Sequence, residues 1–383
     1  MTQTSRIDDI QPFHVMALLA RAKELEALGK DIIHMEIGEP DFATPAPIVN
    51  AGIEAIKTGD VHYTAATGLP ELKQAIAGFY LTQYTETVSD KRIVITPGAS
   101  GALMLALGCV MAEGHEVLLA DPGYPCNRNF VRFLSGKTRS ISVDASTAYQ
   151  LNLKHLQDNW HENTAAVIVA SPSNPTGTLI DKVELVAMAE FVKEKGGYLI
   201  VDEIYHGLVY DNENHTAVNI NDSVIVINSF SKYFNMTGWR LGWVVATEAI
   251  VAKMDKLAQN IFLAAPTTAQ YAALAAFDKD TIAILESHKN EFKQRRDYLL
   301  PELIKLGFKV ETVPQGAFYI YANCEKFSNN SYQFSYDLLE NIGVALTPGK
   351  DFGLNRAHAY VRFAYTTSME RLKEGIKRLN DYL

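Results

Sequence analysis

Residues 229–240, SFSKYFNMTGWR, place an amine, a guanidinium and hydroxyl groups directly after the apolar run SVIVIN. A lysine in such a position is most often a solvated charge. A lysine that forms a Schiff base must instead be desolvated or lie near a second cation, which Arg240 would supply for Lys232. Because two cations at the end of a buried strand repel each other, the stretch predicts an anionic ligand, with a solvated lysine as the alternative.

Asp202 is a second candidate, because it ends the apolar run YLIVD. A carboxylate that is buried without a partner is costly, so Asp202 requires a cation. That cation is either a structural arginine or lysine, or the protonated ring nitrogen of a pyridoxal cofactor, for which an acidic partner is a known device.

Five apolar runs must position these side chains. They are rich in Val, Ile and Leu and do not alternate with polar residues, which is typical of strands covered on both faces. The runs are RIVIT at 92–96, EVLLA at 116–120, AVIVA at 166–170, YLIVD at 198–202 and VIVIN at 224–228. Helical patterns lie between them, so we predict an α/β protein whose large domain holds a mostly parallel sheet flanked by helices.

The clearest helical pattern is DKVELVAMAEFVKEKGG at 181–197. Asp181 and Glu184 have the spacing of a capping box, and Gly196 suits a left-handed stop. The apolar face that this helix would bury consists of Leu185, Met188, Ala189 and Val192.

Polar or Gly/Pro-rich segments follow all five runs, namely PGASGA, DPGYP, SPSNPTG, EIY and SFSK. Ligands of parallel sheets bind beyond the carboxyl ends of the strands, so these segments predict one shared site. Both chain ends, which include GAFYIYAN and AYVRFAY, are predicted to build a smaller α+β domain. The predicted division is 1–44 for an N-terminal arm and part of the small domain, 45–286 for the large domain and 287–383 for the rest of the small domain.

The composition argues against several other classes of protein. A net charge of −9 over 383 residues disfavours a broad nucleic-acid surface. The 3 cysteines form no C-x-x-C pair and the 10 histidines no H-E-x-x-H motif, so we expect neither disulfides nor a metal site. We find no secretory signal and no clean apolar span of about 18 residues, and therefore expect a cytoplasmic protein without a membrane helix.

Six motifs together resemble those of the fold-type I pyridoxal-phosphate-dependent aminotransferases, the class I/II, aspartate aminotransferase-like family. They are MEIGEPDFATP at 35–45, HYTAATGLPELK at 62–73, SPSNPTG at 171–177, DEIY at 202–205, SFSKYFNMTGWRLGW at 229–243 and YVRFAY at 360–365. The resemblance spans nearly the whole chain and implies pyridoxal 5'-phosphate as cofactor. It also implies transfer of an amino group between an α-amino acid and a 2-oxo acid by a homodimer.

The resemblance implies a role for each residue around the cofactor ring. Lys232 would hold the cofactor covalently and shuttle a proton, and Asp202 would pair with the ring nitrogen. Asn174 and Tyr205 would bind the phenolic oxygen of the ring, and Tyr124 would stack on its face.

The resemblance also implies the residues for the phosphate and the substrate. The phosphate would be held by Ala99, Ser100, Ser229, Arg240 and, from the neighbouring subunit, Tyr63. The α-carboxylate of the substrate would be bound by Gly38, Asn174 and Arg362, where Arg362 would act as a bidentate fork. The residues themselves agree at one point, because GAS opens a predicted helix and a helix N-terminus presents free N–H groups to an anion.

The resemblance also implies that the N-terminal segment meets the substrate's side chain, and its residues there are mostly apolar. In the N-terminal segment they are Phe13, Val15 and Met16, with His14 as the polar exception. Some aspartate-using relatives carry a lysine where this chain has Ser100. We therefore favour a neutral side chain, with a dicarboxylate substrate as the alternative if Arg128 or Arg132 lines the pocket.

Three other functions are considered. A lyase of the same fold would share the lysine motif, since fold does not fix the reaction. A serine hydrolase would use Ser100 in a strand–turn–helix elbow, but Ala102 replaces the elbow's second glycine and His358 is the only late histidine. A ligand-sensing regulator would need a DNA-binding module, for which the chain has no spare length or basic charge.

Overall fold

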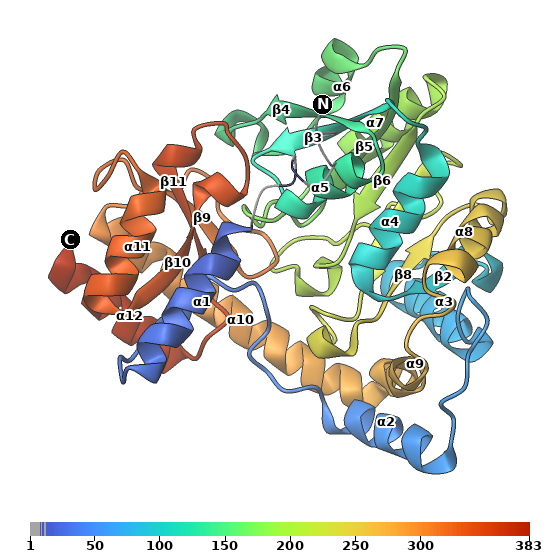
Figure 1. The fold of residues 1–383 in the computed structure, drawn as a ribbon, viewed down its shortest axis with the longest axis horizontal. Coiled ribbons are helices and arrows are strands. Elements are labelled where there is room, and N and C mark those ends of the chain that lie inside the picture. Colours follow the sequence, from blue (N-terminus) through green and yellow to red (C-terminus); the bar gives the residue numbers. More distant parts are fainter. Residues whose placement is uncertain (1–7, 9, 11–12) are drawn as a thin grey trace.

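The computed structural model describes residues 8, 10 and 13–383 (Figure 1). The helices are α1 His14–Ala27, α2 Ala46–Thr58, α3 Pro70–Tyr84, α4 Gly98–Val110, α5 Pro125–Phe133, α6 Leu153–Asn159, α7 Lys182–Glu194, α8 Glu248–Ile261, α9 Thr267–Leu274, α10 Lys279–Leu306, α11 Ser331–Ile342 and α12 Met369–Tyr382. The strands are β1 Ile33–Met35, β2 Ile93–Thr96, β3 Glu116–Asp121, β4 Lys137–Ser142, β5 Thr164–Ala170, β6 Tyr198–Asp202, β7 Val224–Ser229, β8 Gly242–Val245, β9 Tyr319–Asn323, β10 Val344–Pro348 and β11 Tyr360–Ala364.

The larger sheet has the strand order β2-β8-β7-β6-β5-β3-β4. All five predicted runs are strands of this sheet, and β8 alone runs antiparallel to its neighbours β7 and β2. Because β2 is antiparallel to β8 and β8 to β7, β2 points the same way as β7. The carboxyl ends of all five predicted strands therefore lie at one edge of the sheet, and the prediction of a mostly parallel sheet is confirmed.

Both faces of this sheet are covered, as the apolar runs predicted. In β7, Val224 and Val226 belong to one apolar cluster, whereas Ile225 and Ile227 belong to another. Residues of α4 and α8 complete the second cluster, and these helices lie over that face of the sheet (Figure 1). The two-sided burial explains why the sequence of these strands does not alternate.

The predicted helix at 181–197 is α7, and its predicted apolar face is buried. Asp181 caps it by accepting from the N–H of Val183 at 2.8 Å, and Gly196 has a φ of +72°. The capping box is wrong, because the carboxylate of Glu184 accepts from the backbone N–H of Leu153 instead. A contact with a distant segment replaces the local one.

The smaller sheet has the order β1-β10-β11-β9, so both ends of the chain contribute to it as predicted. The predicted strands GAFYIYAN and AYVRFAY are β9 and β11. The limits of the domains stay a prediction, and the limit at 286 falls inside α10, a continuous helix of 28 residues. Within the described residues, no helix is long and apolar enough to cross a membrane.

Candidate active site

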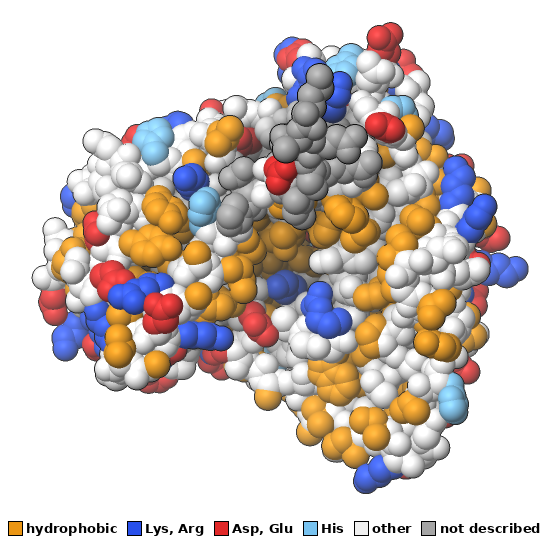
Figure 2. All heavy atoms as spheres, viewed as in Figure 1, with side chains coloured by type: hydrophobic (Ala, Val, Ile, Leu, Met, Phe, Trp, Pro, Cys, Tyr) orange, Lys and Arg blue, Asp and Glu red, His pale blue; other side chains and the backbone are white. Residues whose placement is uncertain are grey.

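A cavity of about 370 Å³ opens between the two sheets at the carboxyl edge of the larger one. Figure 2 shows the hollow in the middle of one face of the molecule, with apolar side chains on its walls and basic groups inside it. Every residue predicted to hold the cofactor or the α-carboxylate of the substrate, except Tyr63, lines this cavity. The prediction that the strand ends share one site therefore agrees with the structure.

Lys232 extends into the cavity from the connection between β7 and β8. Its Nζ donates to the carbonyl oxygen of Gly38 at 2.6 Å. Burial lowers the pKa of the Lys232 ammonium to about 8, with Arg362 and Arg240 adding to the shift and Glu39 opposing it. A large fraction of this amine is neutral just above physiological pH, which suits a nucleophile better than the solvated charge we considered as the alternative.

Asp202 lies at the end of β6 and is 4% exposed. Its Oδ1 accepts from the backbone N–H of Ile204 at 3.2 Å, and it forms no ion pair with any described side chain. Burial raises the pKa of this carboxyl to about 7, against weaker stabilisation of the anion by the Ile204 N–H and Lys232. A buried carboxylate without a cationic partner fits a ligand that carries a protonated nitrogen.

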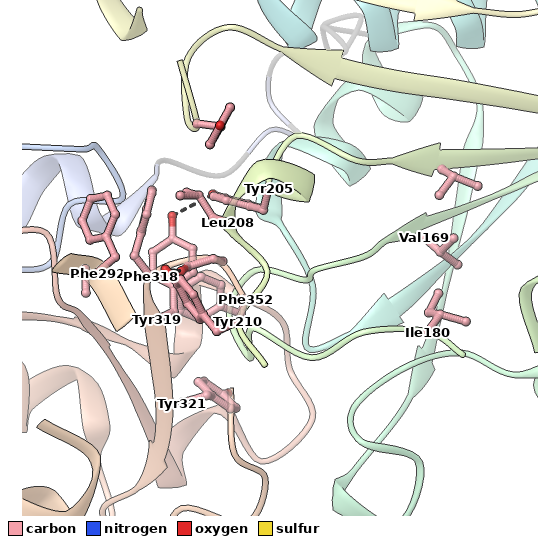
Figure 3. Packing of buried hydrophobic residues seen from close by; sticks show 14 of the residues in the cluster. Val169, Ile180, Tyr205, Leu208, Tyr210, Phe292, Phe318, Tyr319, Tyr321 and Phe352 are labelled. Carbon is pink, nitrogen blue, oxygen red and sulfur yellow. Dashed lines mark hydrogen bonds between the residues drawn. The ribbon is translucent and has the colours of Figure 1, made fainter. Parts of the chain in front are cut away.

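Tyr205 and Tyr319 form a pair of buried hydroxyls across the cavity wall. Their oxygens are 2.8 Å apart, and Figure 3 shows this hydrogen bond between the two parts of the chain. Gly38 has no room for a side chain, because a Cβ there would lie 1.9 Å from the Tyr319 hydroxyl. Sequence reasoning placed Tyr319 in a strand and missed it in the site, although a buried tyrosine hydroxyl requires a partner.

The N-terminus of α4 forms an electropositive end of the cavity that suits an anion. The helix begins at Gly98 without a side-chain cap. The guanidinium of Arg240 lies beside it, since a Cβ on Gly98 would be 2.7 Å from its Nη2, and Arg240 forms no ion pair with the described residues. The guanidinium donates to the carbonyl oxygen of Thr237 at 2.9 Å and lacks a described carboxylate partner, so that it suits a phosphate together with the free N–H groups.

Ser229 is already engaged within the protein at this end of the cavity. Its hydroxyl donates to the carbonyl of Leu241 at 3.2 Å and accepts from the N–H of Ser231 at 3.0 Å. Ser231 also lines the cavity.

Arg362 is buried, at 3% exposed, and does not face solvent. Its guanidinium lies 4.2 Å from the ring centre of Tyr319 and 4.9 Å from that of Phe352. It donates to Asn174 Oδ1 at 2.8 Å and to the carbonyl of Glu36, but forms no ion pair with a described carboxylate. A buried cation without an anion fits a substrate carboxylate.

The apolar wall of the cavity consists of Phe13, Val15, Met16 and Leu19. Sequence analysis named the first three and missed Leu19, which lies one helical turn after Val15. His14 does not line the cavity, because its ring packs edge-on against Tyr332 with 5.3 Å between the ring centres.

Tyr63 lies apart from this cavity. It is 83% exposed and lines another surface hollow, together with Lys91 and Glu248. In a single chain it therefore does not reach the site, and its predicted role across a subunit interface stays a prediction. Tyr124, by contrast, lines the cavity at the start of α5.

Comparison with known proteins places this geometry in a family. The family described as aminotransferase class I and II matches residues 30–379. The chain is 40% identical to the (5-formylfuran-3-yl)methyl phosphate transaminase of Methanocaldococcus jannaschii, with 99% of each chain covered. It is 34% identical to the valine–pyruvate aminotransferase of Mycobacterium tuberculosis, covering 98% of this chain and 97% of that one. The structure of the aspartate aminotransferase from Thermus thermophilus with maleate superposes with a TM-score of 0.94 at 30% identity, with 100% of both chains covered.

Proposed function

The chain belongs to the aminotransferase class I and II family, and from this membership we propose which substrates it takes and which residues act on them. It is an aminotransferase of a pyridoxal-phosphate-dependent family. The alternative functions of a serine hydrolase and of a ligand-sensing regulator are both wrong. Ser100 lies at the start of α4, and the exposed His358 does not line the cavity.

The residues of the cavity fit pyridoxal phosphate as the cofactor. Three features match its ring nitrogen, phosphate and aldehyde in turn: a buried carboxylate without an ion pair among the described residues, a helix N-terminus without a side-chain cap beside the guanidinium of Arg240, and a desolvated amine. When bound, this cofactor withdraws electrons from the α-carbon of an amino acid. Asp202 would hold the ring nitrogen, Arg240 and the α4 N-terminus the phosphate, and Lys232 the aldehyde carbon.

The chain's own groups would carry the proton transfer. The Nζ of Lys232 would take the proton from the substrate's α-carbon, since its lowered pKa makes it both a competent base and a competent acid near neutral pH. Arg362 would hold the α-carboxylate with the help of Asn174 and the backbone at Gly38. Tyr205, fixed by Tyr319, would donate to the phenolic oxygen of the ring.

The preferred substrates would be amino acids with neutral side chains, together with their 2-oxo acids. The observation that carries this proposal is the absence of a fourth cation. Among the described residues that line the cavity, the cations are Lys232, Arg240 and Arg362, and each already has a role. Arg128 lies beside a neighbouring cavity and donates to the backbone of Asp351 at 2.8 Å, and Arg132 does not line the site either.

Half-reaction rates of the purified holoenzyme would test this proposal. Alanine, leucine and phenylalanine should change the absorbance spectrum of the bound cofactor faster than aspartate or glutamate does. Discrimination among the neutral amino acids should be modest, since an apolar pocket distinguishes one methylene by only about 1–3 kcal/mol. A hundredfold advantage for aspartate or glutamate would overturn the proposal in favour of the dicarboxylate alternative.

The homodimer and the cytoplasmic location belong to the same proposal. The exposure of Tyr63 and of nearby apolar side chains such as Ile56 and Val61 supports a second copy of the chain covering this region. The separated cysteines support a reducing compartment.

A further inference from the structure

The first turn of α1 is capped by a residue from the far end of the chain. Asp351 is 2% exposed. Its Oδ1 accepts from the backbone N–H of His14 and its Oδ2 from that of Val15, both at 2.8 Å. Phe13, which precedes the helix, provides no side-chain cap. The free N–H groups of the helix and its positive end are therefore stabilised by this one carboxylate.

Asp351 is itself held against the rest of the site. Arg128 of α5 donates to its carbonyl oxygen at 2.8 Å. The next residue, Phe352, stacks against the guanidinium of Arg362 at 4.9 Å. Through these contacts the start of α1, which carries the apolar wall, is tied to the arginine that would hold the substrate's carboxylate.

We propose that Asp351 is a positioning residue for substrate selection, which fixes the apolar wall relative to Arg362 and thereby sets the preference for long apolar side chains over alanine. The inference rests on the proposed function, because it requires the substrate's side chain to lie against the wall. Without the cap, the first turn of α1 frays and the wall loses its fixed place. A leucine side chain then loses contacts, whereas the methyl group of alanine is too short to have made them.

The test compares kcat/KM for leucine and alanine in the holoenzymes of wild type, Asp351→Ala and Asp351→Asn. In Asp351→Ala the leucine-to-alanine ratio should fall about fivefold to tenfold, through the KM for leucine, which corresponds to the loss of one helix cap. Asp351→Asn keeps one acceptor oxygen and should show a smaller fall. In a Phe13→Ala background the effect of Asp351→Ala on the ratio should shrink, because the two residues act on the same contact.

Asp181→Ala is the matched control, since it removes the side-chain cap of α7, which does not line the cavity. It should leave the ratio unchanged. An unchanged ratio in both Asp351 variants would overturn the inference, as would an equal fall for leucine and alanine. If Asp351→Ala does not fold, Asp351→Asn decides. A wild-type enzyme that prefers aspartate would overturn the proposed function instead, and the leucine-to-alanine ratio would still test the cap.

Discussion

Replacing Asp202 by asparagine should stabilise the cofactor-free protein above neutral pH while removing most of its turnover. Burial raises the pKa of this carboxyl from 3.8 to about 7 in the folded chain. Between these two values the folded protein binds a proton that the unfolded chain has released. The stability contributed by Asp202 is therefore fully present at low pH and is lost as the pH rises through about 7.

The size of the effect follows from the two pKa values. From pH 5 to pH 8, the free energy of unfolding of the wild type should fall by about 2.5 kcal/mol relative to that of Asp202→Asn. A fixed cost of the new amide adds the same amount at every pH and does not alter this change. Turnover should fall about 100-fold or more, since the electrostatic partner of the ring nitrogen is gone.

Urea unfolding of both cofactor-free proteins across this pH range measures the difference directly. Asp222→Asn, which removes an exposed carboxylate, is the control for a change of surface charge. With the cofactor bound, the order of stability should reverse, because the ring nitrogen then needs the carboxylate. If the free energies of unfolding of the two proteins change in parallel from pH 5 to pH 8, the pKa of Asp202 is not raised in the folded chain and the reasoning is wrong.

Three further results are expected. Borohydride reduction of the yellow holoenzyme should fix the cofactor to the peptide that contains Lys232, and peptide mapping that finds the label on another lysine would contradict the role. Arg362→Ala should lower kcat/KM for alanine, leucine and phenylalanine alike by about 100-fold to 10,000-fold, because it removes two charge-assisted hydrogen bonds of about 1.5–3 kcal/mol each. Arg356→Ala, which removes an exposed guanidinium, is the kinetic control, and a loss confined to one amino acid would refute the role in binding the shared carboxylate. Mixing inactive Lys232→Ala subunits with subunits in which the side chain of Tyr63 is truncated should restore part of the activity, since one site of each mixed dimer keeps both groups. No recovery, or full activity in a protein that sediments as a monomer, would exclude the donation of Tyr63 across an interface.

The larger sheet and the placement of the site were predictable because both depend on local sequence. Strands that are apolar on both faces predict a sheet covered on both sides. The residues that follow parallel strands then lie together at the carboxyl edge of that sheet. The burial of Arg362 depends instead on neighbours that are distant in the sequence. Its strand is enclosed by β10 and β9, and its guanidinium lies among the rings of Tyr319 and Phe352. No periodicity within YVRFAY carries that information.

The capping of helices shows the same limit in two directions. Glu184 had the right spacing for a local cap, yet its carboxylate binds Leu153 of another segment. Among the described residues no neighbour in the sequence caps the start of α1 with its side chain, and the partner of this helix end, Asp351, lies 336 residues from Val15 in the sequence. A sequence pattern identifies capping partners that are close in the sequence, but it does not identify a distant partner that the tertiary structure brings to the helix end.

Because β8 runs antiparallel to β7, the length of the loop between them fixes the position of Lys232 relative to Arg240. β7 and β8 are paired from Val226–Val245 to Ser229–Gly242, so the connection that carries Lys232 and Arg240 is a closed hairpin with both ends fixed in register. Phe230 donates to Leu241 across its base, and Met236 folds back to donate to Phe230. The insertion or deletion of a single residue in this loop would therefore shift the amine of Lys232 relative to the guanidinium of Arg240. Libraries aimed at new substrates should keep its length fixed and draw their diversity from the wall on α1.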